Sequence, residues 1–294
     1  MIISELAKSS VKNRGRSSAV FYSVLIAVII LGTLLFIYSE LELGQWNYHR
    51  KMFGDYHAIL YDINEEEYEL LQKNASIKMM EPSKVIQIEN VPFHRPNVVF
   101  YQQSPILFDT CSGLIESQLV EGRLPQQSNE VLASNTFVFE NPSYSLGKTI
   151  RLGDKDYQIC GVYKYQLLSF DKNYLFYGQL ASNDSENLFQ GDSDGVFATI
   201  WFKNERDTYS SMRQILRHLG RKDEDTLLKE GTLNYNTEYL EGKLIFKSGL
   251  IPSRGFVERW SLRVGLLGGV LVLFAVMIYN AFNVWNNQEL RQIG

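Results

Sequence analysis

Two long apolar segments bracket a polar region of the chain. Residues 19–38 are twenty consecutive uncharged residues, and residues 264–285 are also free of charge. At about 1.5 Å per residue, a helix of either length spans the roughly 30 Å hydrocarbon core of a bilayer. Lipid offers no hydrogen-bond partner to backbone amides, so such segments are stable there as helices. The pattern therefore predicts a membrane protein whose two transmembrane helices flank one large domain, residues 39–263.

Inside that domain, the pattern of apolar positions alternates between strand-like and helix-like. Period-2 alternation or β-branched and aromatic content predicts strands at residues 55–61, 84–91, 97–101, 129–134, 146–153, 156–163 and 197–202, of which 146–153 and 156–163 form a hairpin. Amphipathic or helix-compatible spacing predicts helices at 64–74, 105–120 and 206–219, and a stalk that continues the first membrane helix through 39–51. We expect a turn at 121–125, an exposed loop at 182–194 and weaker order over 220–249. These elements describe an α+β domain.

The charges beside the first apolar segment orient the chain. Four basic residues and one acid, Glu5, lie in residues 1–18, whereas Glu40 and Glu42 follow the segment. The positive-inside rule therefore predicts a cytoplasmic basic segment at 1–18 and an extracytoplasmic domain at 39–263. The arginines outside the second segment mildly oppose this orientation, but long domains translocate largely regardless of charge. A cleavable signal peptide is a weaker alternative, because the apolar segment is long and no small-x-small site follows it.

Composition limits the partners of the domain. Residues 39–263 contain 24 Lys and Arg against 31 Asp and Glu, a net charge of −7. An acidic domain is a poor partner for nucleic acid, so none is expected. The two cysteines, Cys111 and Cys160, both lie in this domain, where a disulfide is allowed. Two buried thiols are the favoured alternative, because Cys160 lies in an apolar, strand-like run.

No catalytic, metal-binding or cofactor-binding motif is visible in the sequence. Gly147-Lys148-Thr149 resembles the end of a phosphate-binding loop, but Pro142 stands where that loop needs glycine. The four histidines form no close-set pair, and no carboxylate pair is marked as an acid and a base. We therefore predict that the chain is not an enzyme and binds no cofactor of its own. Gly265 and Gly269 in the second apolar segment have the GxxxG spacing that favours close helix packing in lipid.

Several short strings, in their order along the chain, resemble the FtsX/MacB-type permeases of ABC transporters. They are Gly54-Asp55-Tyr56-His57-Ala58, Glu121-Gly122-Arg123-Leu124-Pro125, Asn129-Glu130-Val131-Leu132, Leu146-Gly147-Lys148-Thr149-Ile150 and Ile159-Cys160-Gly161-Val162-Tyr163. The layout of cytoplasmic amino end, helix, large outer domain and second helix is similar too. The resemblance implies a MacB-like periplasmic core domain in a multi-pass protein of the cell membrane.

The resemblance also implies a mechanism and partners. In this family a separate ABC ATPase subunit binds ATP and moves the membrane helices, and stalks carry that motion to the outer domain in export of peptide, antimicrobial or lipoprotein-type substrates. Residues 286–294 look like the start of the cytoplasmic segment that contacts the ATPase, which implies a coupling role for Glu289, Arg291, Ile293 and Gly294. A second permease module or copy, and further membrane helices beyond Gly294, are expected as well. The chain would then be the amino-terminal part of a longer, two-module permease.

Two other classes remain open. A sensor or receptor anchored by two membrane helices has the same layout, but it requires a signalling segment after Trp285, where the chain reads NQELRQIG. A membrane-anchored hydrolase requires a catalytic set, and none is visible.

Overall fold

The computed structural model describes residues 43–111, 113–165, 173–180, 188–189 and 195–247, and scattered helical positions within 22–40 and 257–279. The chain divides into two compact units, residues 1–45 with 250–294, and residues 46–249. In the first unit, every described position of 22–40 and 257–279 is helical. Within the described positions, no helix is both long enough and apolar enough to cross a membrane. The two transmembrane helices therefore stay a prediction.

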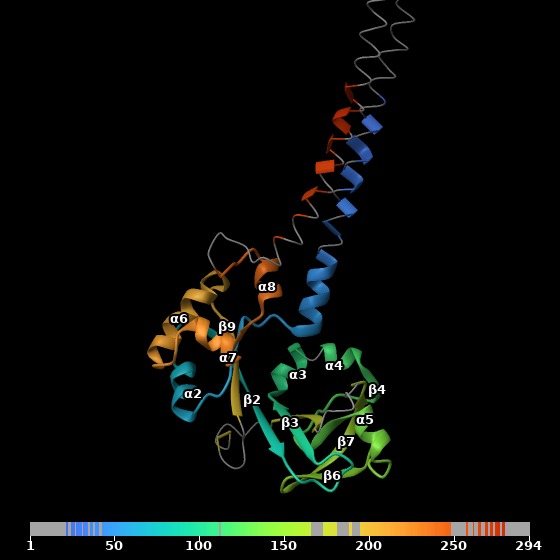
Figure 1. Cartoon of the computed structure of the whole chain (residues 1–294), viewed down its shortest axis with the longest axis vertical. Helices are drawn as coiled ribbons and strands as arrows, with labels where there is room; N and C mark the ends of the chain where they lie inside the picture. The colour runs from blue at the N-terminus through green and yellow to red at the C-terminus, as the bar shows by residue number, and fades with distance from the viewer. Residues whose placement is uncertain are drawn as a thin grey trace, which may run out of the picture. The chain divides into compact units, whose positions relative to one another are not determined.

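The second unit is built on one mixed sheet of ten strands (Figure 1). Its order is β10-β1-β9-β2-β3-β8-β5-β7-β4, and β6 also pairs with β7. The pairs β3–β8 and β5–β7 are parallel, and the other pairs are antiparallel. The strands are β1 (Ala58–Leu60), β2 (Ile77–Ile88), β3 (Asn97–Gln103), β4 (Leu119–Gly122), β5 (Glu130–Ser134), β6 (Thr149–Leu152), β7 (Lys155–Tyr163), β8 (Asn173–Gln179), β9 (Gly195–Phe202) and β10 (Leu233–Tyr235).

Short helices cover parts of this sheet. They are α2 (Glu65–Gln72), α3 (Pro105–Cys111), α4 (Gly113–Ser117), α5 (Asn135–Glu140), α6 (Thr208–His218), α7 (Glu224–Glu230) and α8 (Thr237–Gly242), with a 3₁₀ turn η1 (Glu205–Asp207) before α6. Residues 43–53 are also helical. We call the last part of this helix, residues 46–53, the stalk end; it belongs to the second unit.

Local sequence explains the two best-predicted helices. Asn64 caps α2 by accepting from the Glu67 N–H at 2.9 Å, and the Glu67 carboxylate accepts from the Asn64 N–H at 3.0 Å. Tyr68 and Leu71 of α2 are buried. The stripe of α6 is buried as its spacing predicts, at Tyr209, Met212, Ile215 and Leu216. The predictions of helices at 64–74 and 206–219 are therefore confirmed.

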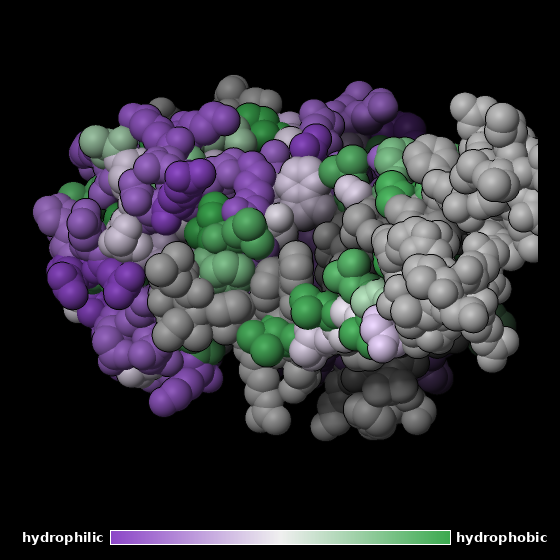
Figure 2. Space-filling model, turned by 90° about the horizontal axis from the view of Figure 1, so that it is seen from above, coloured by the Kyte–Doolittle hydropathy of each residue, from purple (hydrophilic) through white to green (hydrophobic). Residues whose placement is uncertain are grey.

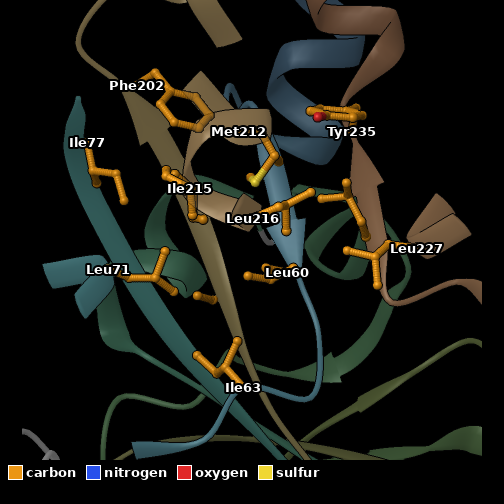
Figure 3. Close-up of a cluster of buried hydrophobic side chains, with 14 of the residues drawn as sticks. Leu60, Ile63, Leu71, Ile77, Phe202, Met212, Ile215, Leu216, Leu227 and Tyr235 are labelled. Carbon is orange, nitrogen blue, oxygen red and sulfur yellow. The ribbon is translucent and has the colours of Figure 1, made fainter. Parts of the chain in front are cut away.

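Apolar side chains form two main cores and one small cluster. In the first core, β1 and β9 contribute Leu60 and Phe202, which face Met212 and Ile215 of α6 (Figure 3). The second core surrounds Phe137 of α5 and Phe176 of β8. A small cluster beneath α3 joins Phe108, Leu132 and Tyr163. Two cores share one continuous sheet, and the described part of residues 46–249 is an α+β domain, the class that was predicted.

The structure differs from the predictions made from the sequence in three places. The predicted helix 105–120 is two short helices followed by β4, so the expected turn at 121–125 begins inside a strand, where Gly122 has φ 81°. The predicted loop 182–194 lies outside the described residues except Leu188 and Phe189, and Leu188 is buried rather than exposed.

The prediction of weaker order over residues 220–249 is wrong for the described residues of this segment, which extend to residue 247. Asp223 and Asn236 cap α7 and α8, and Gly231 ends α7 at φ 75°. Each element is too short for a periodic signal, yet Leu227, Leu233 and Leu240 anchor the segment in the first core.

Candidate functional site

The sequence-predicted site residues lie in the first unit. Glu289, Arg291, Ile293 and Gly294 are outside the described residues. Gly265 and Gly269 are helical, and a Cβ built at either one meets no described atom within 4 Å. Neither the coupling role nor the helix packing is tested by this geometry, and both stay predictions. The described residues instead point to the junction where the stalk end enters the sheet domain.

The stalk end finishes at a sharp, glycine-dependent turn. Gly54 has φ 87°, a left-handed conformation that other residues rarely adopt, and its N–H donates to the Arg50 carbonyl at 2.9 Å. The turn redirects the chain into β1. A Cβ at Gly54 would lie 2.4 Å from the Cys111 Sγ of α3. Glycine is thus required here both for the turn and for the close approach of α3.

A second glycine brings α4 against the stalk end. A Cβ at Gly113 would lie 1.9 Å from the carbonyl oxygen of Lys51 and 3.1 Å from the Cα of Met52. Both are backbone atoms, which a small side-chain adjustment does not move. The first residue of α4 therefore touches the backbone of the stalk end directly.

Helix α8 packs against another side of the stalk end (Figure 1). The Trp46 ring stacks on Tyr239 with ring centroids 5.8 Å apart, and the Arg50 guanidinium lies 5.5 Å from the centre of the Trp46 ring. A Cβ at Gly242 would lie 2.3 Å from the Trp46 Cδ1. The indole therefore occupies the space that glycine leaves open on α8.

Polar contacts fix the same junction. His49 Nε2 lies 2.9 Å from the Glu238 carboxylate at the start of α8. Asn236, the cap of α8, donates from its side chain to the Gly54 carbonyl at 3.2 Å and from its backbone to the His57 carbonyl at 3.1 Å. One asparagine thus ties the end of the stalk, the start of β1 and the start of α8 together.

A charged cluster lies behind this contact. Lys243 donates to Glu205 at 2.6 Å, and the Tyr239 hydroxyl donates to the same carboxylate at 3.2 Å. Burial raises the pKa of Glu205, but the hydrogen bond and charge of Lys243 outweigh it, so its pKa is lowered overall. Glu205 is therefore an ionised anchor for α8.

His57 is a neutral, buried part of the same cluster. Its side chain accepts from the Phe202 N–H at 2.8 Å through Nδ1. Burial lowers the His57 pKa to about 4, against the opposing effect of Glu205. Nearby, Asp55 accepts from the Trp201 indole N–H at 2.8 Å. These bonds hold the start of β1 against β9.

The contacts of the junction fix the position of the stalk end. In the described part of the chain, no three potential metal-ligating side chains lie together. Cys111 and Cys160 are free, half-buried thiols, and burial raises the pKa of each to about 11, which disfavours the reactive thiolate. The arrangement holds the stalk end between two parts of the domain. One is α8, which contributes to the first core, and the other is the α3–α4 pair, which covers the small cluster.

Exposed apolar side chains are distributed unevenly over the described surface. Figure 2 shows one face on which the described residues are mostly hydrophilic at the left and small hydrophobic patches lie toward the middle. Exposed large apolar side chains of the sheet domain include Phe53, Ile106, Leu114, Val120 and Leu244.

Sequence reasoning did not bring the residues of this junction together, although Gly54, Asp55 and His57 lie in one of the family-like strings. The one available signal was glycine inside helix-compatible sequence, at Gly113 and Gly242, which is costly unless packing requires it. Nothing in a single sequence pairs Trp46 with Gly242, because the two are far apart along the chain and meet only through the sheet topology.

Comparison with known proteins shows that the chain is similar to two solved structures. One is the extracellular domain of the noncanonic ABC-type transporter YknZ from Gram-positive bacteria, at 13% identity and TM-score 0.36, covering 61% of this chain and 98% of that one. The other is the periplasmic region of MacB from Actinobacillus actinomycetemcomitans, at 18% identity and TM-score 0.36, covering 62% and 94%. No family model and no curated protein matches the chain.

Proposed function

We propose that this chain is a permease subunit of an ABC transporter, which couples ATP hydrolysis on a partner ATPase to movement of an extracytoplasmic domain. The observation that carries the proposal is the junction at the stalk end. A helix that continues an uncharged apolar segment ends in direct backbone contact with α4 and in ring stacking on α8. Such an attachment suits transmission of motion better than recognition of a small molecule, because the helix end is packed on two sides.

The remaining parts of the proposal follow from the layout of the chain. The basic amino end places residues 1–18 in the cytoplasm, the acidic domain 39–263 outside the membrane, and residues 286–294 inside, where an ATPase is accessible. ATP binds to that partner, and the chain itself is not an enzyme. A second permease module or copy and membrane lipid complete the assembly. The transported material is of the peptide, antimicrobial or lipoprotein type.

The experiment is reconstitution of the full chain in lipid nanodiscs with the ABC ATPase encoded beside its gene. We expect the two to co-purify and the chain to change the rate of ATP hydrolysis by the ATPase. The matched control is the same ATPase with empty nanodiscs. Absence of association would favour the second candidate, a sensor domain anchored by two membrane helices, which shares the layout but needs no ATPase.

A further inference from the structure

Two buried nitrogen atoms on the stalk end have no hydrogen-bond partner among the described residues. They are Trp46 Nε1 and His49 Nδ1, one helical turn apart. The other ring nitrogen of His49 contacts Glu238, so the ring is fixed while Nδ1 stays unpaired. A buried polar atom that loses water without gaining a partner destabilises the state in which it is buried.

The attractive contacts at the same place are strong enough to oppose these costs. Trp46 stacks on Tyr239, and the indole fits against Gly242. On its other side, α8 is held by the Lys243–Glu205 ion pair. The junction therefore combines close packing with two unpaired polar atoms, whereas α4 meets the stalk end through backbone packing at Gly113.

We propose that the contact between the stalk end and α8 is a releasable latch, made by Trp46 and His49 on the stalk end and by Glu238, Tyr239 and Gly242 of α8. Release exposes both nitrogens to water. Docking restores the ring stacking and the His49–Glu238 contact. The contact at Gly113 stays closed, so the stalk end pivots about α4. This inference rests on the proposed function, in which the stalk is the moving part.

The test is amide hydrogen exchange at residues 237–245 in the full chain, held in lipid nanodiscs without any ATPase. Trp46→Phe removes an unpaired N–H and keeps an aromatic ring against Tyr239. Its matched control is Trp201→Phe, which removes an N–H that donates to Asp55 at 2.8 Å. We expect exchange at 237–245 to slow about 5-fold in Trp46→Phe and not to slow in Trp201→Phe.

Two further variants, Gly242→Ala and its control Gly44→Ala, leave the Trp46 indole in place. Gly242→Ala pushes against the indole and speeds exchange, whereas Gly44→Ala, where a Cβ meets no described atom within 4 Å, does not. If Trp46→Phe fails to slow exchange or Gly242→Ala fails to speed it, the latch is wrong. The readout needs no ATPase, so this failure is distinct from failure of the ATPase association that tests the proposed function.

Discussion

The α carbon of Gly113 leaves no space for a side chain beside Lys51, because a Cβ at this position would lie 1.9 Å from the Lys51 carbonyl oxygen. The obstructing atoms belong to the backbone of Lys51 and Met52, so a change of side-chain rotamer cannot move them away. Gly113→Ala should therefore separate α4 from the stalk end and destabilise the domain by about 1–3 kcal/mol, the usual cost of overpacking. Chemical denaturation of the full chain in detergent measures this cost.

Gly44→Ala is the matched control, since it lies in the same helix as Lys51 and its Cβ would meet no described atom within 4 Å. Alanine there should be neutral or stabilising by up to about 1 kcal/mol, because it favours helix over glycine. Equal stability of Gly113→Ala and the wild-type chain would show that the close approach of α4 is not a feature of the folded protein.

The topology is tested at Asp154, an exposed residue in the turn between β6 and β7. In a chain whose Cys111 and Cys160 are replaced by serine, Asp154→Cys should react with a membrane-impermeant maleimide on intact cells. A cysteine at Ser9, in the basic amino-terminal segment, should react only after lysis. The reverse pattern of labelling would place the domain in the cytoplasm and remove the basis of the permease proposal.

Acid should destabilise the junction through His57. Its pKa is about 4 in the folded chain against 6.5 for a free histidine, so the unfolded state binds the proton first as the pH falls. The stability that a neutral His57 provides is therefore complete above about pH 6.5 and is lost as the pH falls toward 4, by up to about 3 kcal/mol.

His57→Asn keeps an oxygen that accepts from the Phe202 N–H but does not titrate. Stability measured by denaturation at pH 7 and pH 4.5 should fall less in this variant than in the wild-type chain. Glu67, Glu130 and Glu140, whose pKa values are lowered, add acid sensitivity to both proteins equally. An identical loss in the two proteins would show that His57 is not the titrating group.

The elements that the sequence predicted well are those that a local pattern specifies. The stripe of α6 and the alternation in the β6–β7 hairpin repeat often enough to be read without neighbours. In contrast, α7 and α8 are about two turns or less each, and their order comes from caps at Asp223 and Asn236 and from burial in the first core.

The candidate site was not predictable in the same way. Gly54 was visible as part of a family-like string, but its contact with Cys111 depends on where α3 lies. Trp46 and Gly242 are adjacent only because the sheet brings β1 beside β10, and α8 follows β10 directly. A constellation formed by long-range topology leaves no spacing signal in one sequence.

The first unit offers a separate prediction about the stalk. Leu43 and Val257 both belong to this unit, are helical and are more than 40% exposed. If the stalk packs against residues 253–263, cysteines at these two positions should form a disulfide in the membrane under mild oxidation. Val276 is also helical and exposed but lies 19 residues beyond Val257, about 28 Å along a helix, so a cysteine there should not pair with one at Leu43. Equal crosslinking from both positions would contradict the packed stalk.

The last prediction concerns Glu289 and Arg291, which follow the second apolar segment. A short polar segment on the cytoplasmic side of the membrane is well placed to receive force from a soluble ATPase, and the resemblance implies that role. Exchange of the two charges, Glu289→Arg with Arg291→Glu, should weaken association with the ATPase or uncouple its hydrolysis from transport about 10-fold or more, since a like-charge contact at an interface costs several kcal/mol. Binding and coupled hydrolysis in nanodiscs measure both effects.

The control for this exchange is the same pair of reversals at Lys73 and Glu69, an exposed ion pair of α2 at 2.9 Å. These charges belong to the sheet domain, and their exchange should leave the ATPase unaffected. Unchanged thermal unfolding of the sheet domain in the Glu289 and Arg291 variant separates lost coupling from misfolding. Wild-type binding and coupled hydrolysis in that variant would mean that the segment is only a solvated end beside the membrane, and force from the ATPase would then have to enter the chain elsewhere.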